Sequence, residues 1–221
     1  PDLPGGLEIV YEDKAILIVQ KPSGLLTAST PDESEETAFT FLRNYLEERD
    51  SKQTLQIIHR LDRFASGLLV FAKNAEVRKQ LKELFAQHDI ERKYWAIVEG
   101  SVERNRGTVR SYLAEKIDFR VHSVRKGEGG QPAATHYRVL KRLSNISALE
   151  VTLETGRKNQ IRVHLSEMGH PVVGDRAYGG GNDPIGRLGL HAFYLGFVHP
   201  TRNVYVEFST DPPKEFLPYI P

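Results

Sequence analysis

Residues 57–73 hold the group of side chains in this chain that is best suited to chemistry. A single carboxylate, Asp62, lies between two cations, Arg60 and Arg63, and an apolar run at 68–72 follows. Flanking cations keep a carboxylate ionised, and an ionised aspartate at the edge of an apolar core is a candidate nucleophile or base. The alternative is a structural turn stapled by salt bridges, and this stretch alone leaves both interpretations open.

A second charged block follows the strand expected at 147–153. Arg157, Lys158 and Arg162 lie at the start of a short helix that is expected to end at Gly169. Cations at a helix N-terminus oppose the helix dipole, so this placement costs free energy and invites a functional explanation. A basic surface helix is the alternative.

Two further stretches are ordinary when each is taken alone. Residues 21–24, Lys-Pro-Ser-Gly, form a turn, because proline fixes one turn dihedral and glycine permits a positive φ. Tyr94 lies in an expected strand at 93–100, where aromatic side chains are common. A functional interpretation of either stretch depends on its occurring together with the two charged blocks.

Together these blocks resemble the motifs of the RluA-type pseudouridine synthases. Residues 59–62 (His-Arg-Leu-Asp) and 66–73 (Ser-Gly-Leu-Leu-Val-Phe-Ala-Lys) resemble the central motif of that family. Residues 21–25 resemble its Lys-Pro-x-Gly-Leu segment, residues 93–100 its tyrosine-bearing strand, and residues 153–164 its Gly-Arg-x-His-Gln-Ile/Leu-Arg-x-His block.

The resemblance implies a role for four of these side chains. Asp62 matches the catalytic residue, and Arg60 matches the arginine that helps to extrude the target nucleotide. Arg162 matches the arginine that pairs with the catalytic aspartate. Tyr94 matches the tyrosine that lies against the target base, where a phenol can stack on uracil and shuttle a proton.

The same motifs place His59 and Ile161 among the residues expected to bind substrate. The sequence departs from the family pattern at Ala65, where threonine is usual, and at Asn159, where histidine is usual. The first departure lies outside the reacting groups, and no role is carried over to the second. The resemblance extends over nearly the whole chain, residues 7–208, and covers no N-terminal RNA-binding module.

The elements that must position these side chains follow from apolar periodicity. Apolar runs and alternation predict strands at residues 7–11, 15–20, 57–58, 68–72, 93–100, 108–113, 117–121, 134–140, 147–153 and 204–209. Helical spacing predicts helices at 37–49 and 75–88, the second capped by Asn74, and one terminal helical turn at 215–219. With the resemblance, this gives an α+β fold: a mainly antiparallel central sheet with flanking helices and loops, in one domain over residues 1–221.

Composition limits the possible functions. The chain of 221 residues has no cysteine, which excludes disulfides and thiolate metal sites and suits a reducing compartment. Its formal net charge is only +1, so any contact with nucleic acid must come from a local basic face. No apolar run is long enough to span a membrane. No P-loop, dinucleotide fingerprint or close metal-ligand grouping is present, so we expect neither a cofactor nor a metal.

The sequence therefore predicts a cytoplasmic, monomeric RNA pseudouridine synthase. We expect it to isomerise uridines in structured ribosomal or transfer RNA by flipping the target base and starting the reaction with Asp62. A non-catalytic RNA-binding module on the same fold is one alternative. A glycosidase with Asp62 as nucleophile is another, but that chemistry needs a second carboxylate, which none of the motif blocks supplies.

Overall fold

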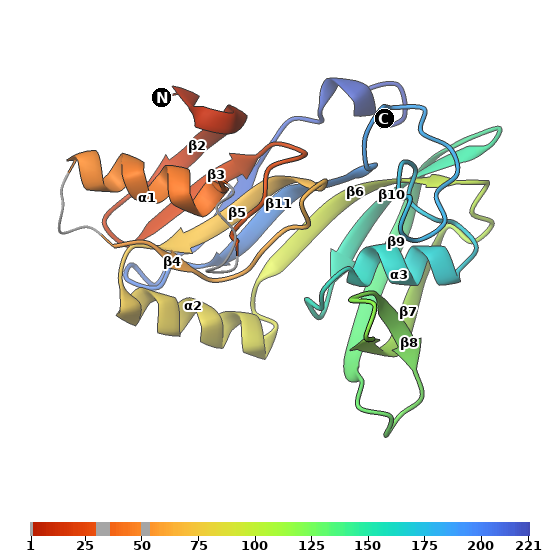
Figure 1. Ribbon diagram of the computed structural model, residues 1–221, viewed down its shortest axis with the longest axis horizontal. Coiled ribbons are helices and arrows are strands. Elements are labelled where there is room, and N and C mark those ends of the chain that lie inside the picture. Colours follow the sequence, from red (N-terminus) through yellow and green to blue (C-terminus); the bar gives the residue numbers. More distant parts are fainter. Residues whose placement is uncertain (1, 30–35, 50–53) are drawn as a thin grey trace. The chain divides into compact units, whose positions relative to one another are not determined.

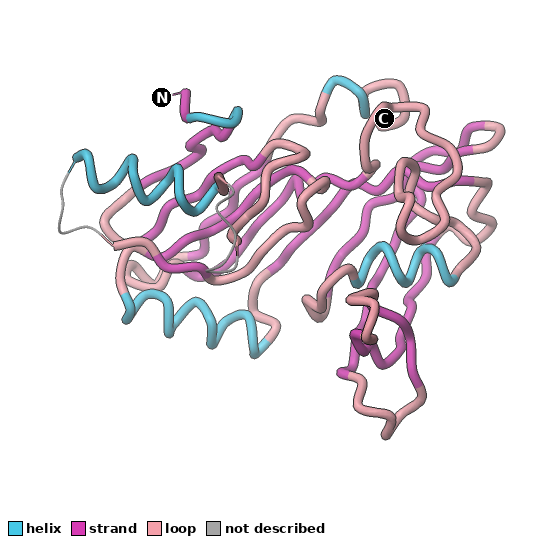
Figure 2. Tube along the Cα trace, in the orientation of Figure 1, coloured by secondary structure: helices cyan, strands magenta, loops and turns pink. Residues whose placement is uncertain are grey.

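A computed structural model describes residues 2–29, 36–49 and 54–221 of the chain. These residues form two compact units, drawn in Figure 1 and coloured by secondary structure in Figure 2. The first unit comprises Pro1–Glu91 and Ala192–Thr210, and the second comprises Arg92–His191 and Asp211–Pro221. Each unit is described by itself, and the single domain expected from the sequence stays a prediction.

The first unit is a sheet flanked by two helices. Its strands are β1 (Asp2–Leu3), β2 (Leu7–Glu12), β3 (Ile16–Lys21), β4 (Gln56–Ile57), β5 (Ser66–Ala72), β11 (Leu190–Val198) and β12 (Tyr205–Ser209). They pair in the order β1-β2-β3-β5-β11, with β4 added to β5 and β12 added to β11. A short 3-10 helix, η1 (Pro4–Gly6), joins β1 to β2. The predicted hairpin is confirmed, because β2 pairs with β3 in antiparallel register.

Apolar strands at the centre of this sheet form the core of the first unit. Every residue of β5 is buried, and β3 contributes a run of four buried apolar side chains. Helices α1 (Ala38–Arg49) and α2 (Ala75–Gln87) flank this sheet, and the two predicted helices are thereby confirmed. The Asn74 side chain accepts a hydrogen bond from the backbone N–H of Val77 at 2.9 Å, which is the predicted cap.

The second unit is an antiparallel sheet that carries one helix. Its strands pair in the order β6-β10-β9-β7-β8. The strands are β6 (Glu91–Glu99), β7 (Arg106–Glu115), β8 (Val121–Val124), β9 (Gln131–Leu143) and β10 (Ile146–Leu153). Helix α3 (Gln160–Glu167) confirms the short helix expected after the second charged block, and η2 (Lys214–Phe216) is the terminal helical turn. The mainly antiparallel α+β class predicted from the sequence is confirmed.

The strand predicted at 117–121 is wrong. Residues 116–120 form the tip of the hairpin between β7 and β8, and β8 begins only at Val121. Alternating apolar residues suggested a strand, but Phe119 has a φ of +60° and turns the chain back on itself. No helix among the described residues combines the length and apolar composition that a membrane crossing requires.

Gly67 has a constrained place at the start of β5. Its φ is +116°, and a Cβ atom added there would lie 2.1 Å from the carbonyl oxygen of Ala192 in β11. That contact is with backbone, which cannot swing away as a flexible side chain can. Glycine therefore lets the strand that follows Asp62 approach β11 closely.

We predict that Gly67→Ala lowers the free energy of unfolding by more than about 2 kcal/mol, because the new methyl group forces β5 and β11 apart. Gly181→Ala is the matched control, since a Cβ at Gly181 meets no atom within 4 Å. Thermal unfolding of both variants measures the effect. Equal melting temperatures for the two would contradict the close approach.

Candidate active site

Asp62 lies in the loop between β4 and β5. The carboxylate-bearing residue is half-buried, and its backbone carbonyl accepts a hydrogen bond from Ala65 N at 3.2 Å, which closes a tight turn. Arg60 and Arg63 on either side are exposed. We call residues 61–65 the Asp62 loop, and the residues that hold it determine where the carboxylate points.

A buried ammonium group ties the Asp62 loop to the end of β3. Lys21 is fully buried, and a buried charge is costly unless its donors are satisfied. The three N–H groups on its Nζ atom are shared among four backbone carbonyls within hydrogen-bonding distance: Pro22 at 2.9 Å, Leu25 at 2.7 Å, Arg63 at 3.0 Å and Ala65 at 2.7 Å. Two of these carbonyls belong to the Asp62 loop, so the Lys-Pro-Ser-Gly turn and this loop form one unit around the cation.

Hydroxyl groups of the same segment add further contacts to the loop. The Thr27 hydroxyl donates to the carbonyl of Leu61 at 3.0 Å and accepts from the N–H of Leu61 at 3.2 Å. The Ser23 hydroxyl donates to the carbonyl of Phe64 at 2.6 Å. Ser23 and Thr27 therefore hold the loop on both sides of Asp62.

His59 is tied to the body of the first unit. Its Nε2 atom accepts a hydrogen bond from Val70 N in β5 at 3.1 Å, so this nitrogen carries no proton. Its ring packs against Phe85 of α2, with the ring centroids 4.8 Å apart. These contacts position the residue just before the exposed Arg60, and the substrate-binding role of His59 stays a prediction.

Tyr94 and Ile161 are both buried in the second unit. Tyr94 lies on β6 opposite Val151 of β10 and is 6% exposed. Ile161 lies in the first turn of α3 and is 5% exposed, so it contributes apolar surface next to Arg162.

Arg162 is held by a two-point ion pair with Asp175. Arg162 Nε lies 2.7 Å from Asp175 Oδ2, and Nη2 lies 2.8 Å from Oδ1. The Asp175 side chain is 1% exposed and that of Arg162 is 15% exposed. Parallel hydrogen bonds of this kind fix the plane of the guanidinium group as well as its position.

Asn159 and Tyr178 complete a cage around the same guanidinium. Arg162 Nη1 donates to Asn159 Oδ1 at 3.1 Å, and the guanidinium carbon lies 4.9 Å from the centre of the Tyr178 ring. Asn159 Nδ2 also donates to the Tyr178 hydroxyl oxygen at 3.0 Å. We call Asn159, Asp175 and Tyr178 the arginine cage. The asparagine at the position where the family usually has histidine is therefore a hydrogen-bonding member of this cage.

A buried polar network anchors the helix that carries Arg162. Gln160 accepts from the Thr155 hydroxyl at 2.7 Å and donates to the Thr135 hydroxyl at 2.9 Å. The ring of His164 joins the Thr135 hydroxyl at 2.8 Å to that of Ser111 at 2.9 Å. Burial lowers the pKa of His164, which keeps its ring neutral at physiological pH.

The predicted site residues are divided between the two units. Asp62, His59 and Arg60 belong to the first unit, and Tyr94, Ile161 and Arg162 belong to the second. Sequence reasoning missed Lys21, Thr27, Asp175 and Tyr178 as positioning residues. Lys21 and Thr27 lie in or next to the stretch at 21–25 that resembles a family motif, and residues 169–175 and 178–179, which contain Asp175 and Tyr178, continue the resemblance after residue 164. The described residues contain no group of three acidic or histidine side chains that would hold a metal ion.

Comparisons with known proteins agree with this geometry. Residues 15–167 match the family model described as RNA pseudouridylate synthase. The chain is 36% identical over 200 residues to an uncharacterized RNA pseudouridine synthase of Bacillus subtilis, YhcT, which covers 89% of this chain and 65% of that relative. It is 36% identical over 228 residues to ribosomal large subunit pseudouridine synthase D of Zymomonas mobilis, which covers 97% of this chain and 71% of that relative.

A solved structure has the same fold. The structure of human RNA Pseudouridylate Synthase Domain Containing 4 superposes with a TM-score of 0.79 at 25% identity, covering 95% of this chain and 90% of that one. The fold and the family match together define an RNA-modifying isomerase of the pseudouridine synthase class. The chain belongs to the RNA pseudouridylate synthase family, in its RluA-type branch.

We predict that Thr27→Val lowers the free energy of unfolding by about 2 kcal/mol, because it leaves both polar backbone groups of Leu61 without their partner. Thr27→Ser keeps the hydroxyl and is expected to retain most of the stability. Urea denaturation of both variants is the measurement. If valine and serine are equally stable at this position, the hydroxyl does not hold the Asp62 loop.

We predict that Asp175→Asn lowers the free energy of unfolding by about 3 kcal/mol, because it removes the buried carboxylate that makes two short hydrogen bonds with the largely buried guanidinium of Arg162. Glu154→Gln breaks the exposed pair with Arg110 in the same unit and is expected to cost less than about 1 kcal/mol. Equal losses for the two variants in urea denaturation would show that the buried Arg162–Asp175 pair contributes no more to the free energy of unfolding than the exposed pair does.

Proposed function

We propose that this chain converts specific uridines of structured RNA to pseudouridine. The observation that carries the proposal is the ionisable Asp62 on a loop fixed by the buried Lys21 ammonium, in a chain of this family. Ribosomal and transfer RNA are the substrate classes, and the name of the Zymomonas mobilis relative favours ribosomal RNA. We further propose that the protein acts as a monomer in the cytoplasm.

The reaction exchanges one bond of the nucleoside for another. The N1–C1′ bond of uridine breaks, the uracil turns, and a C5–C1′ bond forms. The proton on C5 leaves and N1 gains one, so atoms and charge balance without a redox partner. Asp62 starts this sequence, either by attack on C1′ or by removal of the 2′ proton.

Three further side chains have roles in this proposal. Arg60, exposed beside Asp62, fills the gap that the flipped nucleotide leaves in the RNA stack. Arg162 has the role that the family resemblance implies, that of the arginine that orients the catalytic aspartate, and the arginine cage supports this role by fixing the guanidinium. Tyr94 stacks on the uracil and takes the proton from C5.

The uracil must be retained while it is detached from the sugar. A site with apolar walls slows its escape and excludes water, which would otherwise compete for C1′. Ile161, buried beside Arg162, and His59, next to Arg60, are the side chains we place around the bound nucleotide.

We predict that Asp62→Asn folds normally and loses turnover by at least about 10³-fold, because the amide is no longer ionised and cannot start the reaction. Tritium release from total unmodified RNA labelled at uridine C5 measures turnover. Asp89→Asn is the matched control, since Asp89 is an exposed aspartate of the same unit.

Full turnover by Asp62→Asn would contradict the assignment of Asp62. If neither the wild type nor the variant released tritium while both bound RNA equally, the chain would be an RNA-binding module on this fold. Hydrolysis of free nucleosides to uracil and ribose, without tritium release, would instead indicate a glycosidase.

A further inference from the structure

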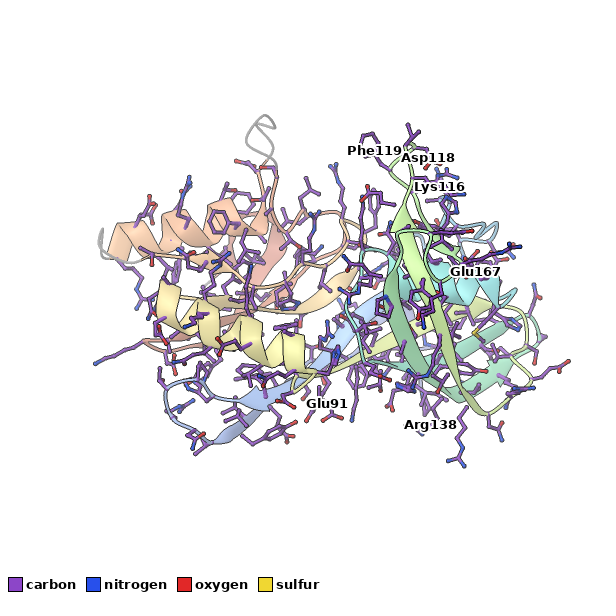
Figure 3. All side chains as sticks on the ribbon, turned by 90° about the horizontal axis from the view of Figure 1, so that it is seen from below. Glu91, Lys116, Asp118, Phe119, Arg138 and Glu167 are labelled. Atoms are coloured by element: carbon purple, nitrogen blue, oxygen red, sulfur yellow. The ribbon has the colours of Figure 1, made fainter. Side chains whose placement is uncertain are left out.

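The tip of the β7–β8 hairpin presents two apolar side chains to solvent. Ile117 is 99% exposed and Phe119 is 77% exposed, although the strands on either side bury Leu113 and Val121. Figure 3 shows the labelled side chains of Lys116, Asp118 and Phe119 at the end of this hairpin. Exposed aromatic groups on a protruding turn lose hydrophobic free energy in the isolated chain, which points to a binding partner.

The backbone of the tip is built to hold Phe119 in an unfavourable conformation. Phe119 N donates to the carbonyl of Lys116 at 2.9 Å, and Lys116 N donates to the carbonyl of Arg120 at 2.9 Å. Arg120 N also donates to the Asp118 carboxylate at 3.1 Å. This tight turn places Phe119 at a φ of +60°, a region that glycine or asparagine enters at lower cost than a bulky residue. The ring is therefore present despite the local preference of the backbone.

Positive charge is concentrated along the hairpin that carries this aromatic side chain. Residues 116–126 carry four cations and only one acid, Asp118, whereas the whole chain has a net charge of +1. Arg157 and Lys158 line an open groove of about 280 Å³ beside the hairpin. Lys158 Nζ lies 3.4 Å from the carbonyl oxygen of Phe119 and 2.5 Å from Glu115. An aromatic face among cations is the surface chemistry that binds unpaired nucleotides, with stacking for the base and charge for the phosphate.

The first residue of β8, directly after the tip, is hydrogen-bonded to the arginine cage. Val121 N donates to the Tyr178 hydroxyl oxygen at 3.0 Å, and that same oxygen accepts from Asn159, which in turn accepts from Arg162. Two residues further along β8, Ser123 donates from both its N–H and its hydroxyl to the Glu167 carboxylate of α3. Hydrogen bonds within one unit therefore connect the hairpin to the helix that carries Arg162.

We propose that residues 116–120 form an RNA-gripping tip in which Phe119 stacks on an unpaired base other than the target uridine. Lys116 and Arg120 bind the neighbouring phosphates. The tip thereby favours RNA that carries an unpaired segment in addition to the target uridine. This inference rests on the proposed function for its substrate, but the tip binds RNA whether or not the bond exchange occurs.

Phe119→Asn tests the tip, because asparagine removes the ring and still adopts a positive φ. The probes are a fluorescein-labelled RNA stem–loop and a fully paired RNA duplex of the same length, with binding followed by fluorescence anisotropy. We expect stem–loop affinity to fall about 10-fold, which corresponds to about 1.4 kcal/mol, with less than about 2-fold change for the duplex. Phe119→Tyr keeps the ring and is expected to bind the stem–loop like wild type.

Leu217→Asn is the matched control, since Leu217 is an exposed apolar residue of the same unit. We expect Leu217→Asn to leave stem–loop binding unchanged. We also expect the melting temperature of Phe119→Asn to be no lower than that of wild type. Wild-type binding by Phe119→Asn, an equal loss for both probes, or a lowered melting temperature that accounts for the loss would overturn the proposal. The first of these results would indicate that the exposed tip binds a protein partner and not RNA.

The two proposals fail in different ways. Absence of tritium release by the wild type, with stem–loop binding that still depends on Phe119, would overturn the bond exchange and support the tip. Tritium release by the wild type, with unchanged binding by Phe119→Asn, would support the bond exchange and overturn the tip.

Discussion

The buried ammonium of Lys21 is the interaction on which the first half of the site depends. It lies at the end of β3 and replaces its water shell with backbone carbonyls, two of them from the Asp62 loop. Because an unsatisfied buried cation is so costly, the loop and the Lys-Pro-Ser-Gly turn must fold together. Thr27 and Ser23 reinforce the same arrangement with hydroxyl groups. The carboxylate of Asp62 is thus presented by a loop with little freedom, and the proposed reaction requires this of a group that acts on one atom of a flipped nucleotide.

The second unit fixes the position of a cation, the guanidinium of Arg162. Arg162 is fixed in position and plane by Asp175, Asn159 and Tyr178, and the helix below it is fixed by the hydrogen bonds of Gln160 and His164. Buried ion pairs add little net stability, so an arrangement with this many partners specifies a direction more than it strengthens the fold. The same cage accepts a hydrogen bond from the β7–β8 hairpin, so the surface that we assign to RNA binding and the site arginine share one set of bonds.

The sequence predicted most of the fold and the site residues, but few of the contacts. Buried strands such as β5, and α2 with its Asn74 cap, follow from periodicity and capping chemistry, which act locally. The hairpin tip was misjudged because alternation does not report the backbone angle at Phe119. Resemblance proposed Asp62 and Arg162 as site residues. It did not find Lys21 as a positioning residue, because its partners are backbone carbonyls, which carry no sequence signal. The pairing of Arg162 with Asp175 depends on how the loop after α3 folds back, which no local pattern encodes.

The measurement that tests this account most directly is made on Lys21→Met, which removes the ammonium and keeps a side chain of similar length. Hydrogen exchange of residues 61–65 and turnover on C5-labelled RNA are measured on the same sample. We expect the loop amides to exchange faster while β3 and β5 stay protected, and kcat to fall by at least about 100-fold, because a small misplacement of a reacting group has that effect. Undiminished turnover, together with faster exchange of the loop amides, would contradict the claim that Lys21 positions Asp62 for the reaction.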